Sequence, residues 1–112
     1  MRIKAIARRR VPGKMNRTEA KYAERLGAIK LAGEIASFEF ENVTLKLAKD
    51  TRYTPDFMVL MPDGTIEFHE VKGFMRDDAW AKLKFAAERF PMFTFRLVKW
   101  VAKNWEIKEI VP

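Results

Sequence analysis

The chain has 112 residues, enough for one compact domain and too few for two ordinary ones. Hydrophobic residues make up 48% of it and aromatic residues 12%, which excludes a disordered chain because burial of this much apolar surface can offset the entropy lost on folding. The lack of cysteine excludes disulfides, thiolate metal sites and cysteine nucleophiles, and the presence of only one serine and one histidine argues against a Ser-His-Asp hydrolase.

The sequence contains no membrane or export signal that we can identify. No stretch approaches the roughly 20 apolar residues that a membrane-spanning helix needs. The first ten residues also lack the continuous apolar core of a secretory signal. We therefore expect a soluble, cytoplasmic protein that does not associate with membranes.

The net charge of +7 is concentrated at the N-terminus. Residues 1–15 contain six basic residues and no acidic ones, whereas the rest of the chain has 16 basic and 15 acidic residues. The basic residues of this arm are Arg2, Lys4, Arg8, Arg9, Arg10 and Lys14. Such a cluster favours binding to the phosphates of DNA, although it can also aid solubility or contact other anionic surfaces. We predict an irregular DNA-binding arm over residues 1–15 and a single domain over residues 16–112.

The segment after the arm has the pattern of an amphipathic helix from Asn16 to Gly33. Four apolar residues recur three or four positions apart and predict one buried face. They are Tyr22, Leu26, Ile29 and Ala32. Asn16 is a good N-cap, Glu19 completes a capping box three residues later, and Gly33 provides the stop.

Alternating apolar and polar residues predict four strands before residue 73. These strands cover residues 35–41, 43–48, 56–61 and 65–72. We expect the first two to pair as a hairpin around Asn42. The turn residues Pro62-Asp63-Gly64 predict that the last two form a second hairpin.

The C-terminal third has the pattern of a helix followed by two strands. Asp77 or Asp78 can cap a helix that runs to Phe90. The strands are expected at residues 93–101 and 105–111, and the first of them can add parallel to the last strand before the helix by a right-handed crossover. The sequence thus predicts an α/β fold in which helices flank a mixed central sheet.

The second hairpin brings two acids and an amine together. Asp56 lies about seven residues before the turn and Glu70 about seven after it, so the two carboxylates are expected to be cross-strand neighbours that can share a hard cation. Alternation places Lys72 on the same face as Glu70. A divalent cation held there can polarise a phosphodiester and activate water beside an ammonium group. A Glu-x-Lys triplet at a strand end is equally compatible with a solvent-facing ion pair.

The spacing of these residues resembles the signature of the PD-(D/E)XK nuclease superfamily. The motif here is Pro55-Asp56, followed after thirteen residues by Glu70-Val71-Lys72, and the resemblance covers about residues 16–100. It implies a restriction-endonuclease-like core and metal-dependent hydrolysis of DNA. By the same resemblance, Asp56, Glu70 and the Val71 carbonyl bind Mg²⁺ or Mn²⁺, and Lys72 lies beside the attacked phosphate.

Glu19 and His69 are the two other polar residues whose roles bear on this site. Many superfamily members carry a glutamate on the helix before the sheet, and Asn16-Arg17-Thr18-Glu19 is similar to that element. Glu19 is therefore a candidate catalytic and metal-binding residue, although it can also bond back to Asn16 as a helix cap. His69 points to the opposite face from Glu70, so we expect it to be packed or hydrogen-bonded and not a metal ligand.

Three further residues are candidate DNA contacts. The resemblance suggests that Tyr53 and Thr54 contact the DNA backbone. Phe74, just past the motif, is a possible wedge between bases. Trp80 shares helical spacing with core residues and is expected to pack inside.

Within the superfamily, the small size, the basic arm and the Asn-x-x-Glu helix look most like phage endonuclease I and archaeal-type Holliday-junction resolvases. The body also resembles small phage proteins that carry Tyr-Thr-Pro-Asp-Phe and His-Glu-Val-Lys-Gly segments. These resemblances imply a phage-encoded homodimer that cuts four-way junctions or other branched DNA. Two alternatives stay open: a duplex-specific restriction or repair-type endonuclease, and a non-catalytic DNA-binding or architectural protein with a nuclease-like fold.

Overall fold

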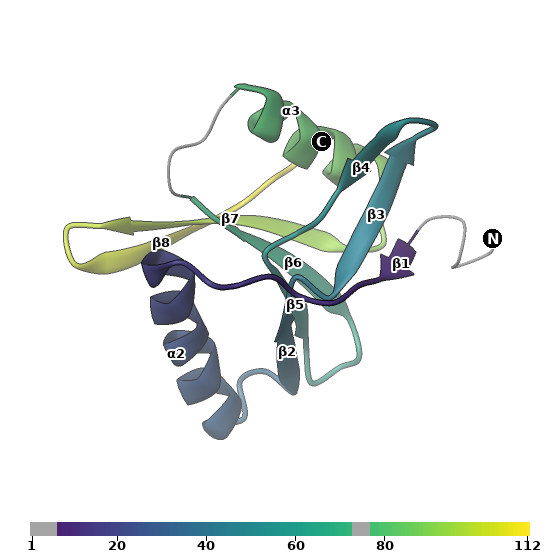
Figure 1. Cartoon of the computed structure of the whole chain (residues 1–112). Coiled ribbons are helices and arrows are strands. Elements are labelled where there is room, and N and C mark those ends of the chain that lie inside the picture. The colour runs from purple at the N-terminus through teal and green to yellow at the C-terminus, as the bar shows by residue number, and fades with distance from the viewer. Residues whose placement is uncertain (1–6, 73–76) are drawn as a thin grey trace.

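The structure, a computed structural model, describes residues 7–72 and 77–112, and these residues form two sheets and two helices (Figure 1). The elements in chain order are β1 (Ala7–Arg9), α2 (Arg17–Leu31), β2 (Ser37–Phe40), β3 (Val43–Ala48), β4 (Thr51–Tyr53), β5 (Phe57–Leu60), β6 (Ile66–Val71), α3 (Asp77–Arg89), β7 (Thr94–Val101) and β8 (Asn104–Glu109). Neither helix in these ranges is long and apolar enough to cross a bilayer.

The larger sheet has five strands in the order β2-β5-β6-β7-β8. Strands β6 and β7 are parallel, whereas the other neighbouring pairs are antiparallel. A smaller antiparallel sheet has the order β1-β3-β4. The predicted α/β class with a mixed sheet is confirmed, as are the second hairpin and the parallel strand that follows the second helix.

Helix α2 has the ends that the sequence predicts. The Asn16 side chain accepts a hydrogen bond from the Glu19 N–H at 2.8 Å, and the Glu19 carboxylate accepts one from the Asn16 N–H at 2.8 Å. These reciprocal bonds satisfy two N–H groups that the first turn leaves without helical partners. After the helix, Gly33 has a φ of 82°, a conformation that costs glycine little.

The five-stranded sheet separates two apolar clusters. Helix α2 covers one face through Tyr22 and Leu26, and α3 packs with the smaller sheet against the other face (Figure 1). We call the cluster that includes Leu83 the α3 cluster and the one that includes Leu26 the α2 cluster. Strand β7 shows the expected alternation, since Leu97 belongs to the α3 cluster and Val98 to the α2 cluster. On β6, Phe68 belongs to the α3 cluster and Val71 to the α2 cluster, so alternation directs Glu70 to the same face as Phe68.

The expected hairpin around Asn42 is wrong. Strand β2 pairs with β5 in the larger sheet, while β3 pairs with β1 and β4 in the smaller one. The chain changes sheets at Glu41, whose φ of 43° lies in the left-handed region. The Asn42 carbonyl accepts a hydrogen bond from the Arg10 N–H at 3.0 Å, so it pairs with the arm.

The predicted irregular arm is also wrong over Ala7–Arg9, because these residues form β1 beside β3. Strand β4 was not predicted. It has only three residues, and its pairing with β3 shifts register between Lys46 and Ala48. Such a short, irregular strand gives too little alternation of apolar and polar residues to be recognised in the sequence.

The second helix follows its prediction closely, from Asp77 to Arg89 against an expected end at Phe90. Trp80 packs half-buried against the α3 cluster, as expected. The side chains of the expected caps, Asp77 and Asp78, lie outside the described residues.

We predict that Phe57→Ala lowers the free energy of unfolding by about 3–5 kcal/mol, because truncation of a fully buried ring leaves a cavity. Phe57 is 0% exposed, and its ring centroid lies 5.6 Å from that of Tyr22 and 5.3 Å from that of Phe40. Urea denaturation measures the change. Phe85→Ala on the exposed side of α3 is the control, with a change below about 0.5 kcal/mol. Equal losses in the two variants would contradict this account of the core.

Candidate metal centre

The β5–β6 register sets Asp56 opposite Glu70. The last pair of the ladder is Phe57 with His69, and Asp56 and Glu70 come one residue beyond it. Phe57 and His69 both contact Tyr22 on the α2 face, so strand alternation directs Asp56 and Glu70 to the other side. The expectation that these acids are cross-strand neighbours is confirmed by this register.

Asp56 is a buried carboxylate with a specific backbone partner. Its side chain accepts a hydrogen bond from the Val71 N–H at 2.8 Å, and its carbonyl accepts one from the Glu41 N–H at 2.8 Å. Burial raises the pKa of Asp56 to about 9, with a further increase from the charge of Glu70, although the Val71 N–H acts in the opposite direction. Burial and the neighbouring acids therefore favour the protonated form of the Asp56 carboxyl.

Glu70 is held by Tyr53. The Tyr53 hydroxyl donates to Glu70 Oε1 at 2.6 Å. Burial raises the pKa of Glu70 to about 6, and the charges of Glu19 and Glu41 add to the rise, while bonds from the Tyr53 hydroxyl and the Asp56 N–H lower it. The Tyr53 side chain is buried beside Glu70, and DNA contact by this residue stays a prediction. Tyr53 orients an acid of the site.

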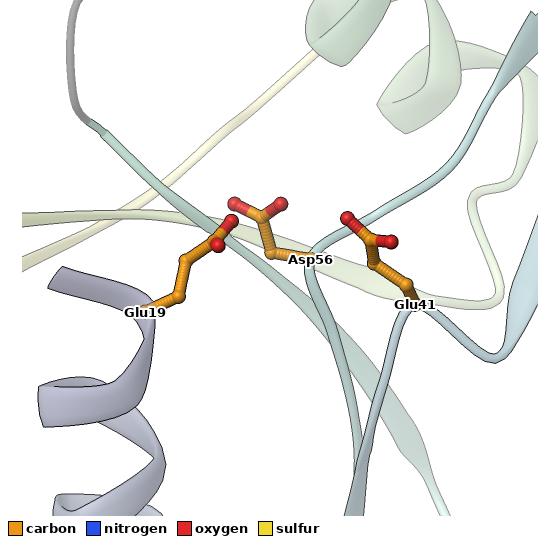
Figure 2. A group of neighbouring side chains, drawn as sticks. All are labelled: Glu19, Glu41 and Asp56. Carbon is orange, nitrogen blue, oxygen red and sulfur yellow. The ribbon is translucent and has the colours of Figure 1, made fainter. Parts of the chain in front are cut away.

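Three carboxylates converge beside Glu70, as Figure 2 shows for Glu19, Glu41 and Asp56. One oxygen from each lies within 4.8 Å of the others. They come from the first turn of α2, the β2–β3 connection and the entry to β5. Carboxylate oxygens gathered from several elements are the ligands that Mg²⁺ and Mn²⁺ prefer.

The sequence predicted two members of this acid cluster and missed the third. Glu19 both completes its capping box and approaches Asp56, so the two interpretations of this residue are compatible. Nothing in the sequence marked Glu41 as a site residue. The strands on either side of it were expected to form a hairpin, which would not have brought its side chain to Asp56. Glu70 is not part of the 4.8 Å group, although it is close enough to raise the pKa of Asp56.

Lys72 and Val71 lie at the end of β6. The Lys72 N–H donates to the Val98 carbonyl at 2.7 Å, which extends the β6–β7 pairing to this residue. Lys72 is half-buried, and alternation places it on the Glu70 face. The Val71 side chain is buried in the α2 cluster, and metal binding by its carbonyl stays a prediction.

His69 lies on the opposite face in a hydrogen-bonded network. Its Nδ1 is 2.7 Å from the Tyr22 hydroxyl, and its Nε2 is 2.9 Å from Glu67. Hydrogen bonds from His69 and then Arg96 lower the pKa of Glu67 to about 2, despite its partial burial. The expectation of a packed and hydrogen-bonded histidine is confirmed.

The basic arm borders the acid cluster. The four expected DNA-binding cations within the described residues are all exposed: Arg8, Arg9, Arg10 and Lys14. Arg10 Nη2 lies 3.6 Å from Glu41 Oε1. Thr54 is half-buried, and its hydroxyl pairs with that of Thr44 at 2.8 Å. Three other predicted DNA contacts lie outside the described residues: Arg2, Lys4 and Phe74.

We predict that Asp56→Asn makes unfolding stability less dependent on pH in metal-free buffer. A carboxyl whose pKa is raised in the folded state to about 9 contributes stability that is complete below its unfolded pKa and lost as pH rises towards 9. The amide keeps an acceptor for the Val71 N–H but cannot ionise. Between pH 5 and pH 8, three pH units at about 1.4 kcal/mol each, the stability difference between variant and wild type should therefore shift by about 4 kcal/mol in favour of the variant.

Urea unfolding with EDTA at both pH values measures this shift. Asp63→Asn, at the exposed β5–β6 turn, is the matched control and should change little between these pH values. Parallel stability curves for wild type and Asp56→Asn would show that Asp56 is not a buried, protonated carboxyl.

Comparison with known proteins gives one match. Residues 14–109, which include the acid cluster and both helices, match the family described as Protein of unknown function (DUF1064). No curated protein and no solved structure was found to match. The match spans most of the sequence, and the chain therefore belongs to the DUF1064 family.

Proposed function

We propose that this protein is a Mg²⁺-dependent DNA endonuclease with a restriction-endonuclease-like core. The observation that carries the proposal is the convergence of Glu19 on Asp56 at the open end of the β5–β6 hairpin, where Glu70 faces Asp56. Glu19, on the first turn of α2, approaches Asp56, and Glu70 lies opposite Asp56 in the β5–β6 register, which supports a shared site for these three acids. The basic arm beside them supplies a surface for DNA phosphates.

The residues of the site fit a divalent cation. A buried carboxyl with a pKa near 9, next to further carboxylates, is an unfavourable arrangement that a bound cation relieves. Asp56, Glu19 and Glu70 would hold Mg²⁺, or Mn²⁺ as a substitute. When bound, the ion supplies Lewis-acid polarisation of the phosphate and activation of water.

The other residues orient the site and the DNA. The Tyr53 hydroxyl fixes the Glu70 carboxylate. Lys72, on the Glu70 face, places an ammonium group where it can stabilise negative charge on the phosphoryl oxygens. The exposed cations of the arm, Arg8 to Arg10 and Lys14, neutralise the DNA backbone next to the acids.

The proposed substrate is branched DNA, most simply a four-way junction cut by a homodimer, in the cytoplasm of a bacterial host of the phage that encodes the protein. Support for this narrower part comes from the resemblance of the sequence to junction resolvases. Cleavage of linear duplex at an equal rate would favour a restriction or repair-type enzyme instead. A non-catalytic DNA-binding protein would bind DNA with steep salt dependence and respond neither to Mg²⁺ nor to Glu70→Gln.

We predict that the purified protein cuts a labelled four-way junction in Mg²⁺ and not in EDTA. Asp56→Asn and Glu70→Gln should each slow cleavage about a thousandfold or more, because each removes a carboxylate needed to hold the ion. Single-turnover cleavage of junction and duplex of the same sequence measures both activity and preference. Glu19→Gln should also slow cleavage, because Glu19 approaches Asp56, whereas the matched control Glu24→Gln, at an exposed acid on the same helix, should retain the wild-type rate. Full activity of Asp56→Asn would reject the proposal.

We also predict that Tyr53→Phe shifts the acidic limb of the pH–rate profile to higher pH. The hydroxyl lowers the pKa of Glu70, so its removal raises that pKa and leaves less ionised Glu70 at a given pH. The expected shift is up to about one pH unit. Tyr22→Phe removes a hydroxyl that pairs with His69 on the other face, and it should leave this limb in place. Identical shifts in both variants would indicate a general loss of stability.

A further inference from the structure

Glu41 links the basic arm to the acid cluster. Its Oε1 accepts a hydrogen bond from the Gly13 N–H at 3.1 Å and lies 3.6 Å from Arg10 Nη2. A Glu41 oxygen is also within 4.8 Å of carboxylate oxygens of Glu19 and Asp56. In Figure 2 the Glu41 side chain approaches Asp56 from the side opposite Glu19. One side chain thus meets two groups of opposite charge.

The backbone at Glu41 is fixed by the strand that carries Asp56. The Glu41 N–H donates to the Asp56 carbonyl at 2.8 Å, and φ is 43°. A residue with a side chain is uncommon in this left-handed region, where glycine would be less strained. A carboxylate at this position is therefore placed at a conformational cost next to Asp56.

Gly13 leaves room for the Glu41 carboxylate. A Cβ at position 13 would lie 2.9 Å from Glu41 Oε1 and 4.0 Å from its carboxyl carbon. The backbone of Gly13 is outside the left-handed range, so alanine is compatible with its conformation. The close atom is at the end of the flexible Glu41 side chain, so this side chain can move to relieve the clash. Alanine at position 13 should therefore move the Glu41 carboxylate and leave the fold intact.

We propose that the segment Arg10–Gly13 positions Glu41 as an additional ligand of the metal centre, so that the arm sets metal affinity as well as contacting DNA. This inference rests on the proposed function for the existence of that centre. The neutral Gly13 N–H holds the Oε1 atom of the Glu41 carboxylate. The Arg10 pair is exposed and contributes less. The alternative is that Glu41 only anchors the arm. In that case its substitution would leave metal affinity unchanged in the absence of DNA, whereas loss of a metal ligand would weaken it.

A double-mutant cycle between Gly13→Ala and Glu41→Gln tests the inference. The dissociation constant for Mn²⁺ is measured by calorimetry on the full chain without DNA. Each single variant should bind Mn²⁺ about tenfold more weakly, in line with the loss or displacement of a group that orients a metal site. The double variant should bind no more weakly than Glu41→Gln alone, because Gly13 acts through Glu41. Gly27→Ala, with nothing within 4 Å of its added Cβ, is the matched control and should bind as wild type.

The outcomes separate this inference from the proposed function. Wild-type affinity in Glu41→Gln, or in Gly13→Ala, overturns the inference and leaves Glu41 as an anchor of the arm. Additive losses in the double variant also overturn it, because Gly13 would then act by another route. If Asp56→Asn abolishes Mn²⁺ binding in the same series, the proposed metal centre stands in either case. Failure of wild type to bind Mn²⁺ rejects both.

Discussion

The hydrogen bond from the Val71 N–H to the Asp56 carboxylate fixes the end of the hairpin on which the site is built. It joins the entry of β5 to the exit of β6 and holds the Asp56 carboxyl where little water reaches it. Burial of an acid is unfavourable unless it is protonated or compensated by a cation. The chain places further acids around Asp56 and so increases the repulsion. Burial of Asp56 among other acids thus costs stability, an arrangement that is typical of functional sites.

The site lies where the two sheets and α2 meet. Glu19 comes from the helix that covers one face of the larger sheet, and Tyr53 from the smaller sheet that packs on the other. The network of Tyr22, His69 and Glu67 ties α2 to β6 behind the acids. Because Tyr22 is one turn after Glu19, this network also limits how far Glu19 can move relative to Asp56. Contacts on both faces of β6 therefore help to position the carboxylates of Glu19 and Glu70.

Local patterns predicted the parts of the fold that local interactions determine. The capping box at Asn16, the turn at Pro62–Gly64 and the alternation in β6 lie within short windows of sequence, and the structure confirms them. The errors concern pairings between distant segments. The residues near Glu41 do not indicate that its backbone is left-handed or that β3 pairs with β1. The residues near Tyr53 do not indicate that this segment forms a strand beside β3. The approach of Glu19 to Asp56 was therefore anticipated from sequence, whereas the contacts of Glu41 and the bond from Tyr53 to Glu70 required the structure.

The acids of the cluster belong to three separate segments of the chain: the first turn of α2, the β2–β3 connection and the entry to β5. Contacts between distant segments form late relative to helices and hairpins, because long loops must close first. A newly synthesised chain thus carries these acids well before it can bring them together. Assembly of the proposed centre would therefore depend on completion of the fold.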